Sequence, residues 1–264
     1  MNTAEAKPAV LELRGLSKSF GPVHAVKSVS LSIYPGEVIG LVGDNGAGKS
    51  TLTRMMAGTI RPDTGDIVVA GEKQTFESAQ DARRAGVETV FQTLALVPGL
   101  DIVENIFLGR ELLASGPLGA VTRTMDVAAM RRRVQEGYER FGLGLPDIRT
   151  KVAGLSGGQR QVVAIARAVL WGSRIVVLDE PTAALGVKQT ELVLSFIEQL
   201  RSHNVAVVFI SHNMQHVMRV ADRVCVLRLG RKVFDGQMSA LTGTDLVALM
   251  TGAATAVEQV AAAG

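Results

Sequence analysis

The chain has 264 residues, of which 47% are hydrophobic and 20% charged, and its 28 Lys and Arg against 25 Asp and Glu give a formal net charge of +3. This balance excludes wholesale disorder, and the basic residues are scattered rather than gathered into one long tract, which argues against a nucleic-acid partner. The N-terminus MNTAEAKPAV has no apolar signal region, and the longest apolar runs are far shorter than the roughly 18 residues that span a bilayer, so we expect a folded chain that does not cross a membrane by itself.

Three segments in the first part of the chain alternate apolar and polar residues. They are Val10–Arg14, Val29–Ile33 and Asp66–Ala70. Alternation of this kind is typical of half-exposed antiparallel strands, because successive side chains of a strand point to opposite faces of its sheet. The pattern therefore predicts a small antiparallel β layer that flanks a main sheet.

Four other runs stay apolar along their length and end at a small or polar residue. Such runs suit a parallel sheet whose two faces are covered by helices, and the stretches between them are long enough for crossover helices. Ligands of open parallel sheets bind beyond the carboxyl ends of the strands, so we expect the site there. The runs are Val38–Gly43, Val87–Gln92, Ile175–Glu180 and Val205–His212.

The first of these runs leads into a sequence typical of a phosphate-binding loop. Its glycines let backbone N–H groups approach phosphates, and the N-terminus of the helix expected after it attracts negative charge. We expect Lys49 to supply a cation for the β- and γ-phosphates of a nucleotide, and the Ser50 hydroxyl to ligate Mg²⁺. The alternative is a glycine-rich turn with a nearby lysine, which the strand before it and the helix after it make less favourable. The predicted nucleotide-binding residues are Gly43, Asp44, Asn45, Gly46, Ala47, Gly48, Lys49, Ser50 and Thr51.

The stretch between Gln92 and Ile175 is mostly helical in pattern, which predicts an insertion between two strands of the main sheet. Within it, Arg131, Arg132 and Arg133 form a compact basic run, which we interpret as a solvated helix face rather than a binding patch. Helices are expected within Asp101–Leu108, Met125–Phe141 and Ser156–Leu170.

Residues 155 to 159 read LSGGQ and precede the last of these helices. Ser156 followed three residues later by Gln159 is a capping box, so one interpretation is simply a well-started helix. That leaves Gly157 and Gly158 unexplained, because each glycine in a helix costs up to about 1 kcal/mol relative to alanine. Something is expected to approach this backbone closely, and a helix N-terminus with bare N–H groups and a free hydroxyl forms a second anion site.

Polar side chains end the other three apolar runs. Asp179 is suited to the Mg²⁺ shell, and Glu180 beside it to orienting or deprotonating a water that attacks the γ-phosphate. The amide of Gln92 could reach Mg²⁺ or that water, and the imidazole of His212 could sense the γ-phosphate. The alternatives are a turn before Pro181 for the two carboxylates and purely structural roles for the other two side chains. Their shared position at strand ends favours function.

Two features lie outside this pattern. Cys225 is the single cysteine and lies in an apolar run, which predicts a buried strand thiol, excludes an internal disulfide and fits a reducing compartment. From about Ala253 the chain is dominated by alanine and small residues, and we expect a frayed tail there.

Together these residues resemble the ATP-binding cassette family, the nucleotide-hydrolysing subunits of ABC transporters, as far as about residue 250. The resemblance makes LSGGQ the signature sequence, Glu180 the catalytic glutamate after the Walker B strand, Gln92 the Q-loop residue and His212 the switch histidine. It also implies that Phe20, in Lys18-Ser-Phe-Gly, stacks on adenine.

The family implies a fold, cofactors and a partner. The expected fold is α/β: a P-loop NTPase core of the RecA-like type with an antiparallel β subdomain and an inserted α-helical signature subdomain. It would form one domain over residues 1–252, with the core and β subdomain at about 1–92 and 172–252, the helical subdomain at about 93–171, and a tail at 253–264. The cofactors would be ATP and Mg²⁺, the metal being held by Ser50, Gln92 and Asp179. Two chains would pair head to tail, so that Ser156, Gly157, Gly158 and Gln159 of one contact the γ-phosphate held by the other.

Three segments narrow the resemblance. GDNGAGKST, EPTAALGVKQT and ISHNM are similar to the ribose, xylose and fructose importers, in their single-cassette form. Gly186 stands where most cassettes have an aspartate in the D-loop, a departure that this subfamily shares.

The resulting prediction is the ATPase subunit of a bacterial monosaccharide importer, peripheral on the cytoplasmic face of the inner membrane. Lys49, Glu180 and His212 would be its catalytic residues. Its partners would be a second copy of itself, transmembrane permease subunits that touch the helical insertion near Val97–Leu100, and indirectly a periplasmic sugar-binding protein. A cassette for amino acids or lipids, a soluble cassette ATPase in translation or DNA repair, and a P-loop kinase remain alternatives, although LSGGQ would have no purpose in a kinase. The sugar itself is not specified by the sequence.

Overall fold

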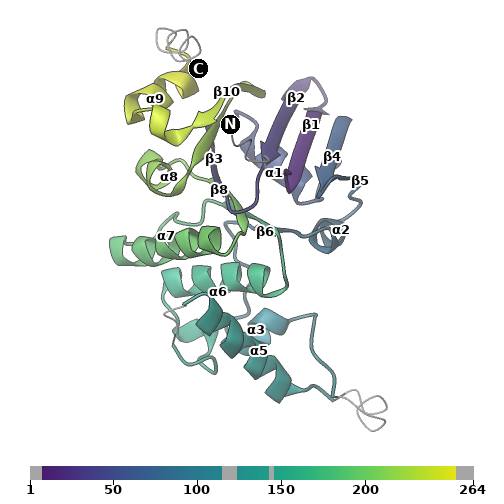
Figure 1. Ribbon diagram of the computed structural model, residues 1–264, viewed down its shortest axis with the longest axis vertical. Helices are drawn as coiled ribbons and strands as arrows, with labels where there is room; N and C mark the ends of the chain where they lie inside the picture. Colours follow the sequence, from purple (N-terminus) through teal and green to yellow (C-terminus); the bar gives the residue numbers. More distant parts are fainter. Residues whose placement is uncertain (1–7, 115–123, 143–145, 254–264) are drawn as a thin grey trace, which may run out of the picture.

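The computed structural model describes residues 8–114, 124–142 and 146–253, and nearly all of the predicted tail lies outside them. Two sheets and a set of helices make up the described chain (Figure 1). The strands are β1 (Leu11–Phe20), β2 (Val23–Ile33), β3 (Val38–Gly43), β4 (Thr64–Val69), β5 (Glu72–Gln74), β6 (Val87–Val90), β7 (Ile175–Asp179), β8 (Ala206–Ile210), β9 (Arg223–Arg228) and β10 (Arg231–Gln237). The α-helices are α1 (Lys49–Met56), α2 (Ala79–Arg84), α3 (Ile102–Phe107), α5 (Val127–Arg140), α6 (Gly157–Leu170), α7 (Val187–Ser202), α8 (Met214–Val220) and α9 (Gly243–Thr251).

The larger sheet has the strand order β10-β9-β3-β8-β7-β6. All of its neighbouring pairs are parallel except β10 with β9. The four apolar runs are therefore confirmed as parallel strands. They show no alternation because both faces are buried: Val38 and Val42 of β3 belong to the hydrophobic cluster that contains α6 and α7 residues, while Ile39 and Leu41 belong to the cluster that contains α1 residues.

The smaller sheet has the order β2-β1-β4-β5, and its pairs are antiparallel. Its inner face packs on the cluster around α1, to which it contributes Leu11, Leu13 and Leu31 among other residues. The alternating pattern is confirmed, because residues between these buried positions, such as Glu12, remain more exposed. The α/β fold class with an antiparallel β layer is confirmed as well.

Helices α3, α5 and α6 come between β6 and β7 in the chain, and Figure 1 shows α3 and α5 at the end of the molecule away from the smaller sheet. They share a cluster of their own, which includes Ile106, Val134 and Val163. The opposite side of α6 contributes Val162 and Ile165 to the cluster shared with α7. This helix therefore joins the inserted helices to the main sheet.

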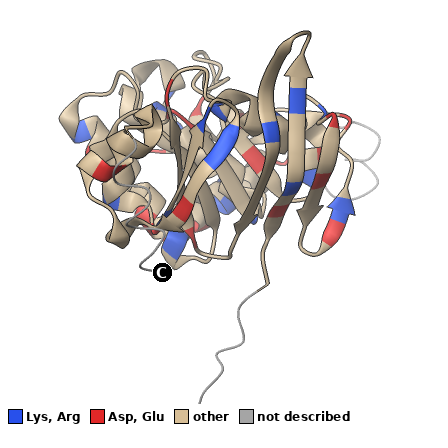
Figure 2. Ribbon diagram, turned by 90° about the horizontal axis from the view of Figure 1, so that it is seen from above, with Lys and Arg blue, Asp and Glu red and all other residues tan. Residues whose placement is uncertain are grey.

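Charged residues of both signs are interspersed over the elements drawn in Figure 2. Arg223 on β9 is largely buried and forms ion pairs with two carboxylates. Its Nη1 lies 2.8 Å from Glu37 Oε1, and its Nε lies 2.6 Å from Asp235 Oδ1. Cys225, also on β9, is fully buried, as predicted. None of the described helices is both long and apolar enough to cross a membrane.

Candidate nucleotide-binding site

The predicted phosphate loop connects β3 to α1 at the carboxyl end of the larger sheet. Gly48, which precedes the helix, has a φ of 105°, and a Cβ built there would lie 2.5 Å from the carbonyl oxygen of Ala25. Only glycine fits such a position. No side chain caps α1, so the N–H groups of its first turn are available to an anion.

Lys49 folds back over this loop. Its Nζ donates hydrogen bonds to the carbonyl oxygens of Gly43 at 2.6 Å and Asp44 at 3.0 Å. Burial lowers the pKa of Lys49, while the negative charges of Glu180, Asp44 and Asp179 oppose that shift. The lysine therefore shares one electrostatic environment with the two carboxylates at the end of β7.

Asp179 and Glu180 lie where β7 ends, beside the loop. Burial raises the pKa of Asp179, the charge of Glu180 raises it further, and Lys49 and Arg54 oppose the shift. Glu180 has a left-handed φ of 53°, and its N–H donates to the carbonyl of Ile210 at 3.0 Å. A carboxylate held in this strained conformation is typical of functional sites, since the surrounding structure must impose it.

His212 is brought to Glu180 because β8 and β7 are neighbours. Its Nδ1 lies 2.8 Å from Oε2 of Glu180, and its side chain is 73% exposed. The approach is an ion-pair distance rather than an aligned hydrogen bond, since Oε2 has no hydrogen-bond donor within the described chain. The imidazole therefore lies at the surface, directly beside a largely buried carboxylate.

A second histidine next to this pair was missed from the sequence. His216 Nδ1 lies 3.0 Å from Thr182 Oγ1, and its Nε2 lies 3.2 Å from the side-chain amide of Asn213. Burial lowers the pKa of His216, which favours the neutral ring. It ties the segment after Glu180 to the start of α8, and only the three-dimensional arrangement reveals it.

A hollow of about 550 Å³ lies beside the phosphate loop, within the size range of small-molecule sites. The predicted residues Asn45 to Thr51 form one wall, and Leu229 also borders it. The other wall comes from the start of β2, including Val23 and His24, which the sequence did not single out. Several predicted site residues are not among the residues that line this hollow: Phe20, Gly43, Asp44, Gln92, Asp179, Glu180 and His212. Phe20 pairs with Val23 across the β1–β2 turn and is 48% exposed, but is not among the lining residues.

Gln92 lies two positions beyond the end of β6 and is exposed. It does not border the hollow, and no hydrogen bond of its side chain occurs within the described residues. The structure thus brings Lys49, Asp179, Glu180 and His212 together near the carboxyl ends of β3, β7 and β8.

The signature sequence starts α6 with the predicted capping box. Ser156 Oγ accepts from the N–H of Gln159 at 3.3 Å, and Gln159 Oε1 accepts from the N–H of Ser156 at 2.9 Å. The predicted free hydroxyl is therefore engaged as an acceptor, although its own proton remains available to donate. None of residues 155–159 borders the hollow at the phosphate loop of the same chain.

The two glycines of this sequence also pack closely against other residues of the same chain. A Cβ on Gly158 would lie 2.9 Å from both the Cβ and the carbonyl oxygen of Gln189, and a Cβ on Gly157 would lie 2.9 Å from Leu185 Cδ2. The close approach predicted for this backbone is thus provided by the first turn of α7. The glycines alone do not require a phosphate.

The donor set fits Mg²⁺ bound together with a nucleotide. Ser50 and Asp179 offer oxygen atoms, the ligands that Mg²⁺ prefers, and Mg²⁺ usually takes only one or two carboxylates plus phosphates and waters. Among the described residues no group of three or more His, Cys, Asp and Glu could hold a metal by itself.

A narrower cleft of about 270 Å³ lies where the inserted helices meet β6. Glu88 on β6 is its one acidic lining residue, with Oε2 3.5 Å from Arg110 and Oε1 3.8 Å from Arg83. Burial raises the pKa of Glu88 despite these arginines. Trp171 closes the cleft, with the guanidinium of Arg110 5.1 Å from its ring centroid.

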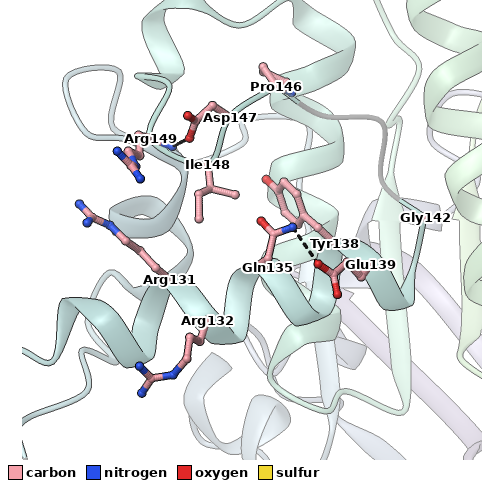
Figure 3. A pocket seen from close by; sticks show the side chains of 10 residues that line it. All are labelled: Arg131, Arg132, Gln135, Tyr138, Glu139, Gly142, Pro146, Asp147, Ile148 and Arg149. Atoms are coloured by element: carbon pink, nitrogen blue, oxygen red, sulfur yellow. Dashed lines mark hydrogen bonds between the residues drawn. The ribbon is translucent and has the colours of Figure 1, made fainter.

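Another hollow, of about 780 Å³, lies between α5 and residues 146–149 (Figure 3). Arg131 and Arg132 extend from α5 at its border, both exposed, as the interpretation of a solvated face predicts. Arg133 is exposed as well, and its guanidinium lies 5.1 Å from the ring centroid of Trp171. No residue of the predicted nucleotide site borders this hollow.

The fold and the site define a P-loop nucleotide hydrolase of the cassette type, with lysine, carboxylates and histidine at the carboxyl end of a parallel sheet. A protein-family model described as "ABC transporter" matches residues 26–183, and the chain belongs to this family. It is an ATP-binding cassette ATPase.

Curated relatives extend the match over nearly the whole chain. The fructose import ATP-binding protein FrcA of Rhizobium meliloti is 45% identical over 94% of this chain and 96% of its own length. The xylose/arabinose import ATP-binding protein XylG of Sulfolobus acidocaldarius is 41% identical over 92% of this chain and 94% of its own length. A ribose import ATP-binding protein of Burkholderia cenocepacia is 42% identical over 96% of this chain, which spans only 48% of that longer protein.

Solved structures show the same fold. A nucleotide-free ATP-binding cassette from an ABC transporter superposes with a TM-score of 0.75 at 24% identity, covering 87% of this chain and 91% of that one. The dimeric structure of a bacterial ABC transporter cassette superposes with a TM-score of 0.69 at 26% identity, covering 86% of this chain and 98% of that one.

Proposed function

We propose that the chain is the ATP-hydrolysing subunit of a bacterial importer for a monosaccharide such as fructose, ribose or xylose. The observation that supports this most directly is the 45% identity to a fructose import ATP-binding protein over almost the full length of both chains. ATP binding and hydrolysis would alternate between two dimer states and drive a permease between inward- and outward-facing conformations.

The roles of the site residues follow from their chemistry. Residues Gly43 to Thr51 cradle the phosphates through backbone N–H groups, and Lys49 exchanges its carbonyl contacts for the β- and γ-phosphates. Ser50, Asp179 and Gln92 would hold Mg²⁺, which neutralises phosphate charge when bound. Phe20, which is exposed and pairs with the lining residue Val23, would stack on adenine.

Glu180 would act as the general base for the attacking water. Its carboxylate is fixed by an unusual backbone conformation and is largely buried, with a side chain only 18% exposed. His212 approaches the same carboxylate and is largely exposed, so it can turn towards the γ-phosphate and report its presence.

A second copy of the chain would complete the site. The signature residues Ser156 to Gln159 do not border their own chain's hollow, yet their helix presents backbone N–H groups and an exposed serine. In a head-to-tail dimer this helix would meet the γ-phosphate held by the partner. We also propose that residues 1–252 act as one domain, with about 93–171 as its helical subdomain.

The cleft at Glu88 and the helical segment beside it would receive the permease. Val97, within the segment predicted for this contact, is 40% exposed, and Leu108 at the cleft is 46% exposed. Arginines outnumber the single acidic residue in the lining, which suits a partner segment carrying an acidic side chain. The protein would thus be peripheral on the cytoplasmic face of the inner membrane, with a periplasmic binding protein as an indirect partner and no nucleic acid.

Co-purification from membranes tests this function. The tagged chain is expected to retain permease subunits, and ATP hydrolysis by the complex is expected to rise when one sugar-loaded binding protein is added. Stimulation by an amino-acid-binding protein would overturn the sugar assignment. Stimulation by ribosomes or DNA, without any membrane partner, would overturn the transport function.

A further inference from the structure

The start of the signature helix rests directly on the first turn of α7. A Cβ on Gly158 would lie 3.0 Å from the Cα of Gln189 and 2.9 Å from its carbonyl oxygen, so no layer of side chains separates the two backbones. Gln189 Oε1 also lies 3.3 Å from the position of a Cβ on Gly157. Helices α6 and α7 run side by side from this contact (Figure 1).

Gln189 follows Glu180 closely in the chain, and the segment that connects them has a hydrogen-bonded turn at each end. The N–H of Ala183 donates to the carbonyl of Glu180 at 3.1 Å, and the N–H of Gln189 donates to the carbonyl of Gly186 at 3.0 Å. Ala184 between them has a left-handed φ of 59°. Each of these hydrogen bonds closes a turn, one directly after Glu180 and one at the start of α7.

We propose that Gln189 is a positioning residue that orients its own chain's signature helix towards the ATP bound by the partner chain. This inference rests on the head-to-tail dimer of the proposed function. In that dimer Glu180 acts on the nucleotide bound by the phosphate loop of its own chain, whereas Gly157 and Gly158 contact the nucleotide bound by the partner chain. The contact at Gln189 therefore joins the two ATP sites within one chain.

The contact matters because hydrogen bonds from a helix N-terminus to a phosphate depend on direction. Misplacement of an active-site group by 1 Å can cost on the order of 100-fold in rate. Gln189→Ala leaves the Cβ and backbone of residue 189 against Gly158 but removes the side-chain amide that lies beside Gly157. We therefore expect Gln189→Ala to change the release rate of the nucleotide that faces this signature helix about tenfold.

A fusion of two full-length copies by a flexible linker makes the test possible, because the copies can then carry different substitutions. Both copies carry Glu180→Gln, so that ATP is held without hydrolysis, and one copy carries Lys49→Ala, so that a single phosphate loop is loaded. The rate of release of radiolabelled ATP is measured. Gln189→Ala in the copy with Lys49→Ala is expected to speed release about tenfold, and in the other copy less than about twofold.

Three controls separate positioning from general damage. Lys188→Ala, on the exposed neighbouring position of the same turn, is expected to leave release unchanged in either copy. Gln189→Met keeps the length and packing of the side chain and is expected to restore slow release. Thermal unfolding of each fusion shows whether a variant has lost its fold.

Ser156→Arg, placed in each copy in turn, tests the dimer itself. If Ser156→Arg speeds release equally from both positions, the head-to-tail pairing is wrong. If Ser156→Arg acts only from the copy with Lys49→Ala while Gln189→Ala acts equally from both or from neither, the pairing stands and the role of Gln189 is wrong.

Discussion

Replacement of Gly158 by alanine tests whether the signature glycines are needed for packing inside a single chain. The added Cβ would meet the Cβ and carbonyl oxygen of Gln189 at 2.9 Å, and a backbone atom cannot rotate away. Overpacking of this kind lowers the free energy of unfolding by about 1–3 kcal/mol, and the better helix propensity of alanine offsets up to about 1 kcal/mol of that loss. We expect Gly158→Ala to lower the free energy of unfolding by about 1–2 kcal/mol, or the melting temperature by about 2–8 °C.

Gly157→Ala provides the matched comparison, one residue earlier in the same turn. Its Cβ would meet Leu185 Cδ2 at 2.9 Å and Gln189 Oε1 at 3.3 Å, both at the ends of flexible side chains. These atoms can move aside, so the melting temperature is expected to stay within about 2 °C of the wild type. Gly154→Ala, where a Cβ meets nothing within 4 Å, serves as a control.

The assay is thermal unfolding without nucleotide, so that only contacts within the chain contribute. If Gly158→Ala melts at the wild-type temperature, packing against Gln189 does not explain this glycine. The reason for the two glycines would then lie with a ligand alone, as the sequence first indicated.

Three further predictions concern the site and the core. Glu180→Gln is expected to lower ATP turnover about 100-fold or more while ATP binding persists, because the proposed general base is lost; turnover at the wild-type rate would remove Glu180 from that role. Cys225 is fully buried and burial raises its pKa to about 12, so a thiol reagent should modify the folded chain about 1,000-fold more slowly than the unfolded chain. Burial raises the pKa of Asp235, but hydrogen bonds from Arg223 and Lys232 outweigh burial and lower it overall. Its charge thus stabilises the fold above the unfolded pKa of about 4 and ceases to do so as the pH falls through the lower folded value. Asp235→Asn should cost about 1–3 kcal/mol at pH 7, and denaturant titrations should show that difference shrinking below about pH 4; a constant difference would contradict the ion pair.

The chemistry of the site could be predicted because it depends on local sequence. A phosphate loop needs glycines with special backbone angles, a lysine and a following helix within a few residues, and all of these are contiguous from Gly43 to Thr51. The same holds for the capping box at Ser156 and for the parallel strands, whose two buried faces leave continuous apolar runs. The position of β9 between β3 and β10 was not predicted, because strand order depends on pairing between distant segments.

The sequence by itself determined the class of protein, the phosphate loop and the identity of the polar residues at the strand ends. Only the tertiary structure decided that His212 lies beside Glu180 and that Phe20 lies outside the wall of the hollow. It also decided that Gln189 lies so close to residue 158 that only glycine fits there. The physical reason is that the groups a residue can donate, accept or ionise belong to the residue itself. Which residues it contacts depends on packing between elements that are far apart in the chain.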